Sequence, residues 1–231
     1  MMKAIVGDIH GCYHTLTELY KTVNAKYGNI PFYSTGDLVD RGLHSDLVIS
    51  FILEKNFQVV MGNHDYMFMM NAVNPKNFLA ELWFYNGCET TLISYREKDK
   101  LKEQHLEYLK RLPLFINLED VFISHAGVPK DVKSIVTVRK EIDFKLVEEW
   151  AKQSVETENG ILWTRRDLLN IKKLQVVGHT PKRKIVYLPK SNVVYIDTWA
   201  FYDKFLSAVI VDEGKIIDQF SIPTIKADVY D

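Results

Sequence analysis

The N-terminal part of the chain repeats one arrangement three times: a short apolar run, a polar loop and a segment with helical periodicity. The apolar runs cover residues 3–7, 31–35 and 57–61, and the helical segments cover residues 13–27, 45–55 and the stretch from residue 66. This alternation predicts βαβ units and a parallel sheet. Right-handed crossovers bring the carboxyl ends of parallel strands to one edge, so the three polar loops should meet there.

The rest of the chain carries further helices and strands without an internal repeat or a domain boundary. Apolar spacing predicts helices at residues 66–72, 75–85, 89–95, 100–112 and 144–153. It predicts strands at residues 114–118, 121–124 and 174–177, then consecutive antiparallel strands at residues 185–188, 193–196, 205–211 and 215–220. We therefore expect a single α/β domain over residues 1–231.

Composition excludes several classes of protein. Apolar residues make up 47% of the chain, enough for a sizeable core, and the net charge of −1 does not support non-specific nucleic-acid binding. No stretch resembles a signal peptide or a membrane span, so we expect a cytoplasmic protein with no membrane partner. Cys12 and Cys88 are too few for a disulfide framework and are interpreted as small buried residues.

Metal-competent side chains follow five of the expected strands; they are Asp8, His10, Asp37, Asn63, His64, His125 and His179. Carboxylate, amide and imidazole groups are ligands for manganese, iron and zinc. A lone histidine after a strand is more often a core or surface residue, but four of the seven histidines stand at such strand ends. His105 does not, and we interpret it as a solvated residue of a charged helix.

The number of these groups suggests two ions that share Asp37. Asp8 and His10 would complete one site, and the other would add Asn63, His125 and His179. Two ions about 3.5–4 Å apart activate a water and neutralise charge on the entering and leaving oxygens of an in-line displacement. This chemistry suits hydrolysis of a phosphate ester.

The same segments carry a family resemblance. They are Gly7-Asp8-Ile9-His10-Gly11, Gly36-Asp37-Leu38-Val39-Asp40-Arg41-Gly42, Gly62-Asn63-His64-Asp65, His125-Ala126-Gly127 and Gly178-His179-Thr180. In order and separation they resemble the phosphoprotein phosphatase branch of the calcineurin-like metallophosphoesterases, from residue 3 to about residue 210. The chain is most similar to the compact bacterial and phage serine/threonine phosphatases, to which the symmetrical diadenosine polyphosphate hydrolases are closely related.

The resemblance implies a sandwich of two mixed β-sheets flanked by helices, with two divalent metal ions at the sheet edges. Manganese is our first choice, with iron or zinc as alternatives. Asp8 and His10 would bind the first ion and Asp37 would bridge, while Asn63, His125 and His179 would bind the second.

The resemblance also assigns roles around the substrate. His64 would be the general acid, and Asp40 would orient it and raise its pKa. Arg41 and Arg165 would bind the phosphate, together with Asn63. We interpret the neighbouring Arg166 as an exposed charge and Asp65 as a residue that starts a helix. Neither residue is expected to take part in the chemistry.

Three functions are weighed. The first is a serine/threonine protein phosphatase that acts by direct attack of metal-bound hydroxide, with no covalent role for Cys12. The second is a dinucleoside polyphosphate hydrolase, such as one for diadenosine tetraphosphate. The third, a non-catalytic phosphoprotein-binding scaffold, is disfavoured because every expected ligand is present. The partner would be a phosphorylated protein or a small phosphoester, and the sequence carries no signal for oligomeric state.

Particular residues divide the first two functions. Asp40 is typical of the protein phosphatases, whereas Asp65 is typical of the diadenosine hydrolases. The second function also needs surfaces on which bases stack. The aromatic candidates are Trp163, Trp199, Phe201 and Tyr202. Trp199 stands where the family usually has glycine, and it either lines the substrate cleft or fills a gap in the core.

Overall fold

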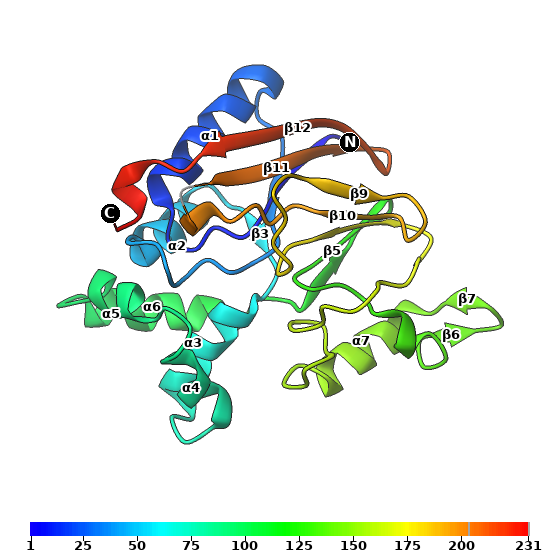
Figure 1. Cartoon of the computed structure of the whole chain (residues 1–231), viewed down its shortest axis with the longest axis horizontal. Coiled ribbons are helices and arrows are strands. Elements are labelled where there is room, and N and C mark those ends of the chain that lie inside the picture. Colours follow the sequence, from blue (N-terminus) through cyan, green and yellow to red (C-terminus); the bar gives the residue numbers. More distant parts are fainter. Residues whose placement is uncertain (203, 231) are drawn as a thin grey trace.

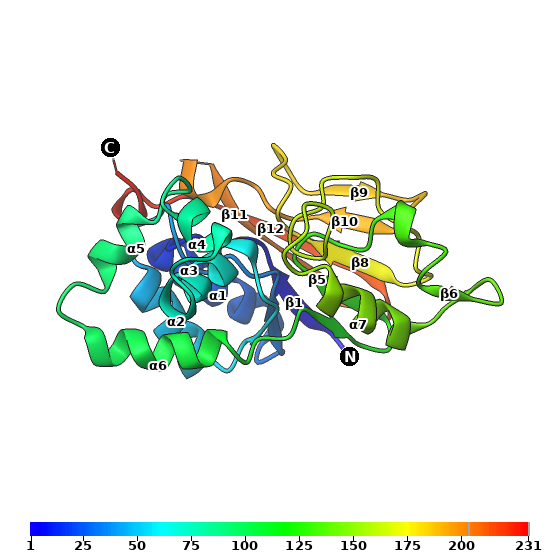
Figure 2. The same cartoon turned by 90° about the horizontal axis from the view of Figure 1, so that it is seen from below.

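The computed structural model describes residues 1–202 and 204–230. Two five-stranded sheets pack face to face, and helices cover their outer sides (Figures 1 and 2). The first sheet has the order β12 (Lys215–Pro223), β11 (Phe205–Asp212), β1 (Lys3–Val6), β2 (Phe32–Ser34), β3 (Gln58–Val59). The second has the order β4 (Phe115–Asn117), β5 (Val121–Ser124), β8 (Leu174–Val177), β10 (Val193–Tyr195), β9 (Val186–Leu188). The expected mixed sandwich is confirmed.

Alternation along the central strands builds the layers. In β1, Ile5 packs into the core between the sheets, whereas Ala4 and Val6 pack into the core beneath the helices. In β5, Val121 and Ile123 join the inter-sheet core, and Phe122 faces the opposite way. Because successive strand residues point to opposite faces, a strand buried on both sides must be apolar throughout.

Most helices lie beside one sheet or the other. They are α1 (Tyr13–Tyr27), α2 (Ser45–Glu54), α3 (Asn63–Val73), α4 (Phe78–Trp83), α5 (Glu89–Ser94), α6 (Asp99–Leu109) and α7 (Phe144–Gln153). Figure 2 shows α1 to α6 grouped at one end of the molecule and α7 at the other, near the small hairpin of β6 (Thr137–Val138) and β7 (Glu141–Ile142). Among the described residues, no helix is long and apolar enough to span a bilayer.

Parallel pairing of β1, β2 and β3 brings the three N-terminal loops together, as predicted. Backbone bonds join the first two loops, since the His10 amide donates to the Asp37 carbonyl at 2.8 Å. The third loop differs in one respect, because α3 begins at Asn63 and not near residue 66. Asn63 and His64 therefore occupy the first turn of a helix, which fixes their directions.

The expectation of four consecutive antiparallel strands near the C-terminus is wrong. β9 and β10 pair antiparallel in the second sheet, and β11 and β12 pair antiparallel in the first. Between them the chain crosses from one sheet to the other, so that β10 pairs in parallel with β8, and β11 pairs with β1. Apolar periodicity indicates that a segment is a strand but does not encode which strand it pairs with.

The interpretation of His105 as a solvated residue is also wrong. Its side chain is only 2% exposed. The Tyr95 hydroxyl lies 2.7 Å from Nδ1, and the Ser50 hydroxyl lies 3.4 Å from Nε2. The apolar side of α6 carries this histidine inward, where its ring contacts Tyr95 edge-on. Burial lowers the pKa of His105 from 6.5 to about 4.

This shift predicts acid sensitivity. Between about pH 6.5 and 4 the unfolded chain holds a proton on His105 that the folded protein lacks, so stability is lost as the pH falls through this window. From pH 7 to pH 5 the free energy of unfolding should fall by about 2 kcal/mol more in the wild type than in His105→Gln. Urea unfolding of both proteins at pH 7 and pH 5 measures this difference in the free energy of unfolding. Equal losses in the two proteins would show that His105 does not titrate in this way.

Candidate metal centre

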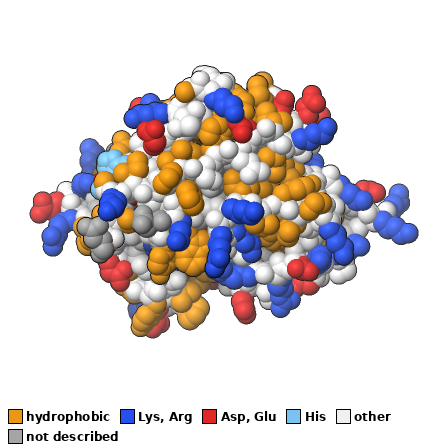
Figure 3. All heavy atoms as spheres, turned by 45° about the horizontal axis from the view of Figure 1, so that its top comes forward, with side chains coloured by type: hydrophobic (Ala, Val, Ile, Leu, Met, Phe, Trp, Pro, Cys, Tyr) orange, Lys and Arg blue, Asp and Glu red, His pale blue; other side chains and the backbone are white. Residues whose placement is uncertain are grey.

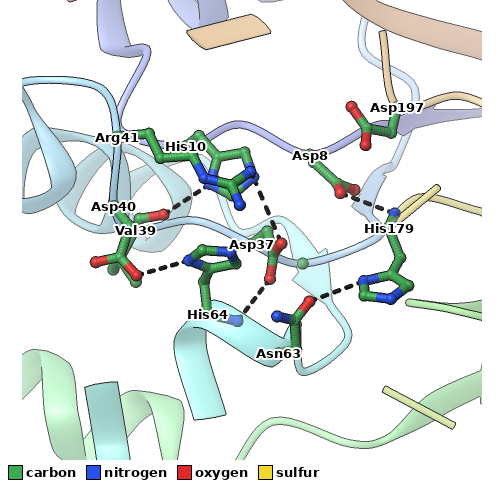
Figure 4. A network of polar contacts seen from close by, with 12 residues as sticks. Asp8, His10, Asp37, Val39, Asp40, Arg41, Asn63, His64, His179 and Asp197 are labelled. Carbon is green, nitrogen blue, oxygen red and sulfur yellow. Dashed lines mark hydrogen bonds and ion pairs between the residues drawn. The ribbon is translucent and has the colours of Figure 1, made fainter. Parts of the chain in front are cut away.

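Loops at the ends of both sheets converge on one cleft of about 1060 Å³. Its lining includes Asp8, His10, Asp37, Asn63, His64 and His179. His125 is fully buried, and its Nε2 lies 2.7 Å from Oδ1 of Asn63. The structure thus brings together all seven metal-competent side chains that the sequence singled out, and Figure 4 shows most of them pointing toward one another.

Several non-glycine residues of these loops adopt left-handed backbone conformations. They are His10 (φ 47°), Asp37 (φ 51°), Asp40 (φ 71°), Arg41 (φ 72°), His179 (φ 58°) and Trp199 (φ 65°). Such a conformation costs about 1–3 kcal/mol for a residue with a β-carbon. Strain gathered at one cleft is typical of functional sites, where the surrounding structure holds side chains in directions that an unstrained loop would not give them.

Three of the histidines share one arrangement, in which one ring nitrogen contacts a backbone carbonyl. The contacts are His10 Nδ1 to Val39 O at 2.9 Å, His125 Nδ1 to Thr35 O at 2.8 Å and His179 Nε2 to Trp163 O at 3.0 Å. A nitrogen that faces a carbonyl must carry the proton, so the opposite nitrogen has a free lone pair. Metal-bound histidines are held in this way.

The free nitrogens of these rings face two oxygen atoms that can bind a metal ion, Oδ2 of Asp37 and Oδ1 of Asn63. Nε2 of His10 and Nε2 of His125 lie 3.5 and 3.6 Å from Oδ2 of Asp37. Oδ1 of Asn63 lies 2.7 Å from Nε2 of His125 and 2.9 Å from Nδ1 of His179. Nε2 of His10 also faces the N–H donor Nη1 of Arg41 at 3.1 Å. Converging lone pairs of this kind are suited to a shared cation, which would take the place of that contact.

His64 is held differently. Its Nδ1 bonds to Oδ2 of Asp40 at 2.7 Å, a carboxylate in place of a carbonyl. Asp40 is itself fixed by Trp83 Nε1 at 2.9 Å and by the Thr91 hydroxyl at 2.7 Å. Proximity alone would group His64 with His10 and Asp37 as possible ligands. The carboxylate partner distinguishes it and is the arrangement of a histidine that exchanges protons.

The pKa of His64 differs from expectation. A raised pKa was expected from Asp40, but the pKa of His64 lies well below its usual value, chiefly because the ring is buried and then because His10 and Arg41 bring positive charge. Asp40 is buried as well, which raises its own pKa far above the ordinary value. A bound phosphate would bring negative charge to this region and act in the opposite direction on His64.

Buried carboxylates concentrate negative charge in this centre. Burial raises the pKa values of Asp8, Asp37 and Asp197, and the charges of Asp37 and Asp197 raise that of Asp8 further. A β-carbon at Gly178 would lie 1.8 Å from Oδ1 of Asp8, so the backbone closes directly around this acid. Divalent cations relieve such a concentration of negative charge, and the donor types fit manganese, iron or zinc.

Some residues that shape the centre were missed. Asp197 was not among the expected site residues, although it is 4% exposed and lies beside Asp8. Thr35 donates to Oδ1 of Asp8 at 2.9 Å. Asp65 does more than start a helix: its two oxygens accept from the amides of Leu38 at 2.9 Å and Gly62 at 3.2 Å, which ties two loops together.

Three arginines, Arg41, Arg165 and Arg166, line the cleft. The Arg41 guanidinium lies 4.3 Å above the ring of Phe201, and its Nη1 is 3.1 Å from Nε2 of His10. Arg165 also lines the cleft and helps to lower the pKa of His179. Arg166 makes an ion pair with Asp131 and is 56% exposed, in agreement with its interpretation as a surface charge.

Aromatic residues form the rim of the cleft beside these arginines. Trp199 is stacked against Phe201 with centroids 6.2 Å apart, and Tyr202 lies 5.1 Å from Trp199. Trp199 is 37% exposed and Tyr202 is 60% exposed. Of the two alternatives for Trp199, the lining of the cleft is therefore confirmed. Its φ of 65° lies in the left-handed region that favours glycine.

Cys12 takes no part in the chemistry. It is fully buried, its thiol donates to the His10 carbonyl at 3.4 Å, and burial raises its pKa well above the ordinary value. A thiol kept protonated is a poor nucleophile. Cys88 is buried as well, as expected.

Comparison with known proteins now assigns the family, since residues 1–211 match the calcineurin-like phosphoesterase model. The chain belongs to this family. A bis(5'-nucleosyl)-tetraphosphatase PrpE [asymmetrical] of Oceanobacillus iheyensis is 34% identical over 92% of the chain and 90% of its own length. Serine/threonine-protein phosphatase 1 of Salmonella typhimurium is 27% identical over 86% of each chain. The crystal structure of a putative diadenosine tetraphosphatase has a TM-score of 0.62, with 22% identity over 97% of this chain and 94% of its own.

Membership makes this calcineurin-like phosphoesterase a metal-dependent phosphoric ester hydrolase. The family uses a dinuclear divalent metal centre, and the Asp and His groups of the cleft could hold the ions. The expectation of a serine/threonine phosphatase is not decided by these similarities and stays a prediction.

Proposed function

We propose that this calcineurin-like phosphoesterase hydrolyses dinucleoside polyphosphates. The observation that carries the proposal is the exposed aromatic pair, Trp199 and Tyr202, on the rim of a cleft that is also lined by Arg41 and Arg165. A dinucleoside polyphosphate needs both features, because its phosphates bind guanidinium groups and its bases stack on aromatic rings. Relatives named as asymmetrical bis(5'-nucleosyl)-tetraphosphatases, which match more than nine-tenths of the chain, support the same substrate.

We propose these roles in the chain. Asp8, His10 and Asp37 hold one divalent ion, and Asp37, Asn63, His125 and His179 hold the second. When bound, the two ions supply Lewis acidity and activate water for attack on phosphorus. Manganese remains the first choice.

The substrate phosphate lies between Arg41 and Arg165, each of which can donate two parallel hydrogen bonds, and Asn63 adds an amide donor. His64 keeps Nδ1 bonded to Asp40, so Nε2 is the nitrogen that faces the leaving oxygen. The negative charge of the bound phosphate raises the pKa of the ring, and Nε2 delivers the proton that it then holds. The stack of Phe201 on Arg41 fixes the guanidinium plane before substrate arrives.

A second candidate is a serine/threonine protein phosphatase, which the sequence favoured first. The buried pair of Asp40 and His64, in the segment typical of protein phosphatases, supports it, as does the Salmonella relative of that name. A phosphoprotein does not need the aromatic rim, whereas a dinucleotide does. We therefore rank the dinucleotide first.

A substrate panel tests the ranking. With manganese-loaded protein, kcat/KM for diadenosine tetraphosphate should exceed kcat/KM for a phosphoserine peptide by at least about 100-fold, because two stacked bases contribute about 1–3 kcal/mol each. An aryl phosphate serves as the reference for chemistry without either group. A preference for the phosphopeptide would reverse the assignment, and chromatography of the nucleotide products would show which anhydride bond is cleaved.

A variant at the rim tests whether Trp199 stacks on a base of the substrate. Trp199→Gly suits a backbone with φ of 65°, so the fold should tolerate it. It should raise KM for diadenosine tetraphosphate by about tenfold through the loss of one stacking surface and leave kcat/KM for the aryl phosphate within about threefold. Tyr187→Ala removes an exposed aromatic on β9, outside the cleft, and is the matched control. Equal effects on both substrates would remove the stacking role.

A further inference from the structure

A second group of possible metal ligands lies away from the cleft, where the C-terminal end of the chain meets α1 and the loop before α2. His14 belongs to the first turn of α1, His44 precedes α2, and Asp228 ends the short 3₁₀ helix Lys226–Asp228. One ligand atom from each residue lies within 4.8 Å of those of the other two. The fold thus joins three segments that are far apart in the sequence.

Both imidazoles of this group are accessible. His14 and His44 are partly exposed, with ring centroids 5.1 Å apart and planes at 89°. Figure 3 shows histidine atoms at the molecular surface, on the side where Figure 1 places the C-terminus. The remaining five histidines are all buried, so these two are set apart from the rest.

Asp228 is a fixed carboxylate. It is fully buried, and its Oδ2 accepts from the Thr15 amide at 2.7 Å and from the Thr15 hydroxyl at 2.6 Å. Among the residues that the structure describes, its Oδ1 accepts one hydrogen bond, from the His14 amide at 2.9 Å. A carboxylate oxygen has two lone pairs, so Oδ1 keeps one for a further partner while the other bonds hold the group in place.

His44 repeats the arrangement found in the metal-competent histidines of the cleft. Its Nε2 lies 2.8 Å from the Ala227 carbonyl, so this nitrogen carries the proton and Nδ1 has the free lone pair. A carbonyl that orients an imidazole is the usual support behind a metal-bound histidine. The same turn that supplies Asp228 therefore also orients His44.

We propose that His14, His44 and Asp228 bind a further divalent ion of the class that prefers imidazole with carboxylate, such as Zn²⁺ or Co²⁺. Two imidazoles and one carboxylate leave coordination positions for water, and thiolates are not required. The ion fastens the C-terminal turn to the catalytic loops: the Leu43 amide donates to the Asp228 carbonyl at 2.9 Å, and the His44 amide donates to the Gly11 carbonyl at 3.0 Å. This site stands independently of the substrate proposed above.

Cobalt binding tests the site without reference to activity. Full-length protein is titrated with Co²⁺ and its metal content is measured by mass spectrometry, in the wild type, in His44→Gln and in His14→Gln. Each variant should bind one ion fewer per chain than the wild type, whatever number the cleft holds. His105→Gln, which removes a buried histidine from another place, is the control and should lose none. An unchanged ion number in both variants would overturn the proposal.

Thermal unfolding gives a second measure. In an Asp37→Asn background that weakens the cleft sites, Zn²⁺ at about 100 times its Kd should raise Tm by about 5 °C, because the ion binds only the folded chain. The shift should become much smaller when His44→Gln is added, because only the weakened cleft sites then remain. A shift of the same size in the double variant would place the responsible ion elsewhere and overturn the assignment.

Discussion

Replacing His64 with asparagine is expected to lower kcat by about 10²–10⁴-fold, with both metal ions still bound. The ring is bonded through Nδ1 to Asp40, and the backbone amide of His64 donates to Oδ1 of Asp37 at 2.9 Å. That amide remains in the variant, so the carboxylate keeps its position while the proton donor is lost. Steady-state kinetics with a dinucleoside polyphosphate, and metal analysis of the same sample, measure both effects.

The matched control is His105→Asn, which also removes a buried imidazole but lies outside the cleft. It should keep kcat within about threefold of the wild type and lose stability instead. Asp40→Asn should lower kcat as well, because the carboxylate sets the direction of the His64 ring. If His64→Asn lost one metal ion, His64 would be a ligand and its assignment as the acid would be wrong.

Replacing Asp37 with asparagine should lower the metal affinity of both sites by more than about 100-fold. Mutating a residue that only supports a metal ligand already lowers affinity by about 10–100-fold, and Asp37 is placed as a ligand between the two sites. Its Oδ2 lies 3.5 Å from Nε2 of His10 on one side and 3.6 Å from Nε2 of His125 on the other. Isothermal titration with Mn²⁺ measures the loss. Asp8→Asn is the comparison, since it should weaken one site much more than the other.

Asp37→Asn should also raise the stability of the metal-free protein. Burial, followed by the charge of Asp65, raises the folded-state pKa of Asp37 well above that of the unfolded chain. Ionised Asp37 therefore destabilises the metal-free fold at pH values above its unfolded pKa, and a neutral amide removes this cost. A higher Tm without metal, together with a smaller rise when Mn²⁺ is added, is the expected pair of results. If Asp37→Asn kept one of the two metal sites at its wild-type affinity, the bridging role of Asp37 would be contradicted.

The sequence predicted which polar side chains would lie together better than it predicted what surrounds them. Asp8, Asp37 and Asn63 each follow one of the three parallel strands of the first, mixed sheet, and parallel pairing alone brings such loops to a common edge. His125 and His179 follow β5 and β8, which are also parallel neighbours. Local patterns were sufficient here because the same rule operates in both sheets.

Partners that come from distant helices could not be predicted in this way. Trp83 and Thr91 hold Asp40 but lie 43 and 51 residues away from it, on α4 and α5. His105 stands in a helix of charged residues, and only the packing of α6 shows that its side chain faces inward. The crossing between β10 and β11 is likewise set by which sheet has a free edge, and this does not appear in the periodicity of either strand.

The central claim is that these loops form one dinuclear centre, and anomalous diffraction at the manganese edge tests it most directly. Crystals grown with Mn²⁺ should give two peaks in the cleft. The first should be bonded to Asp8, His10 and Asp37, and the second to Asp37, Asn63, His125 and His179. A single peak in the cleft, or a peak bonded to His64, would contradict the account.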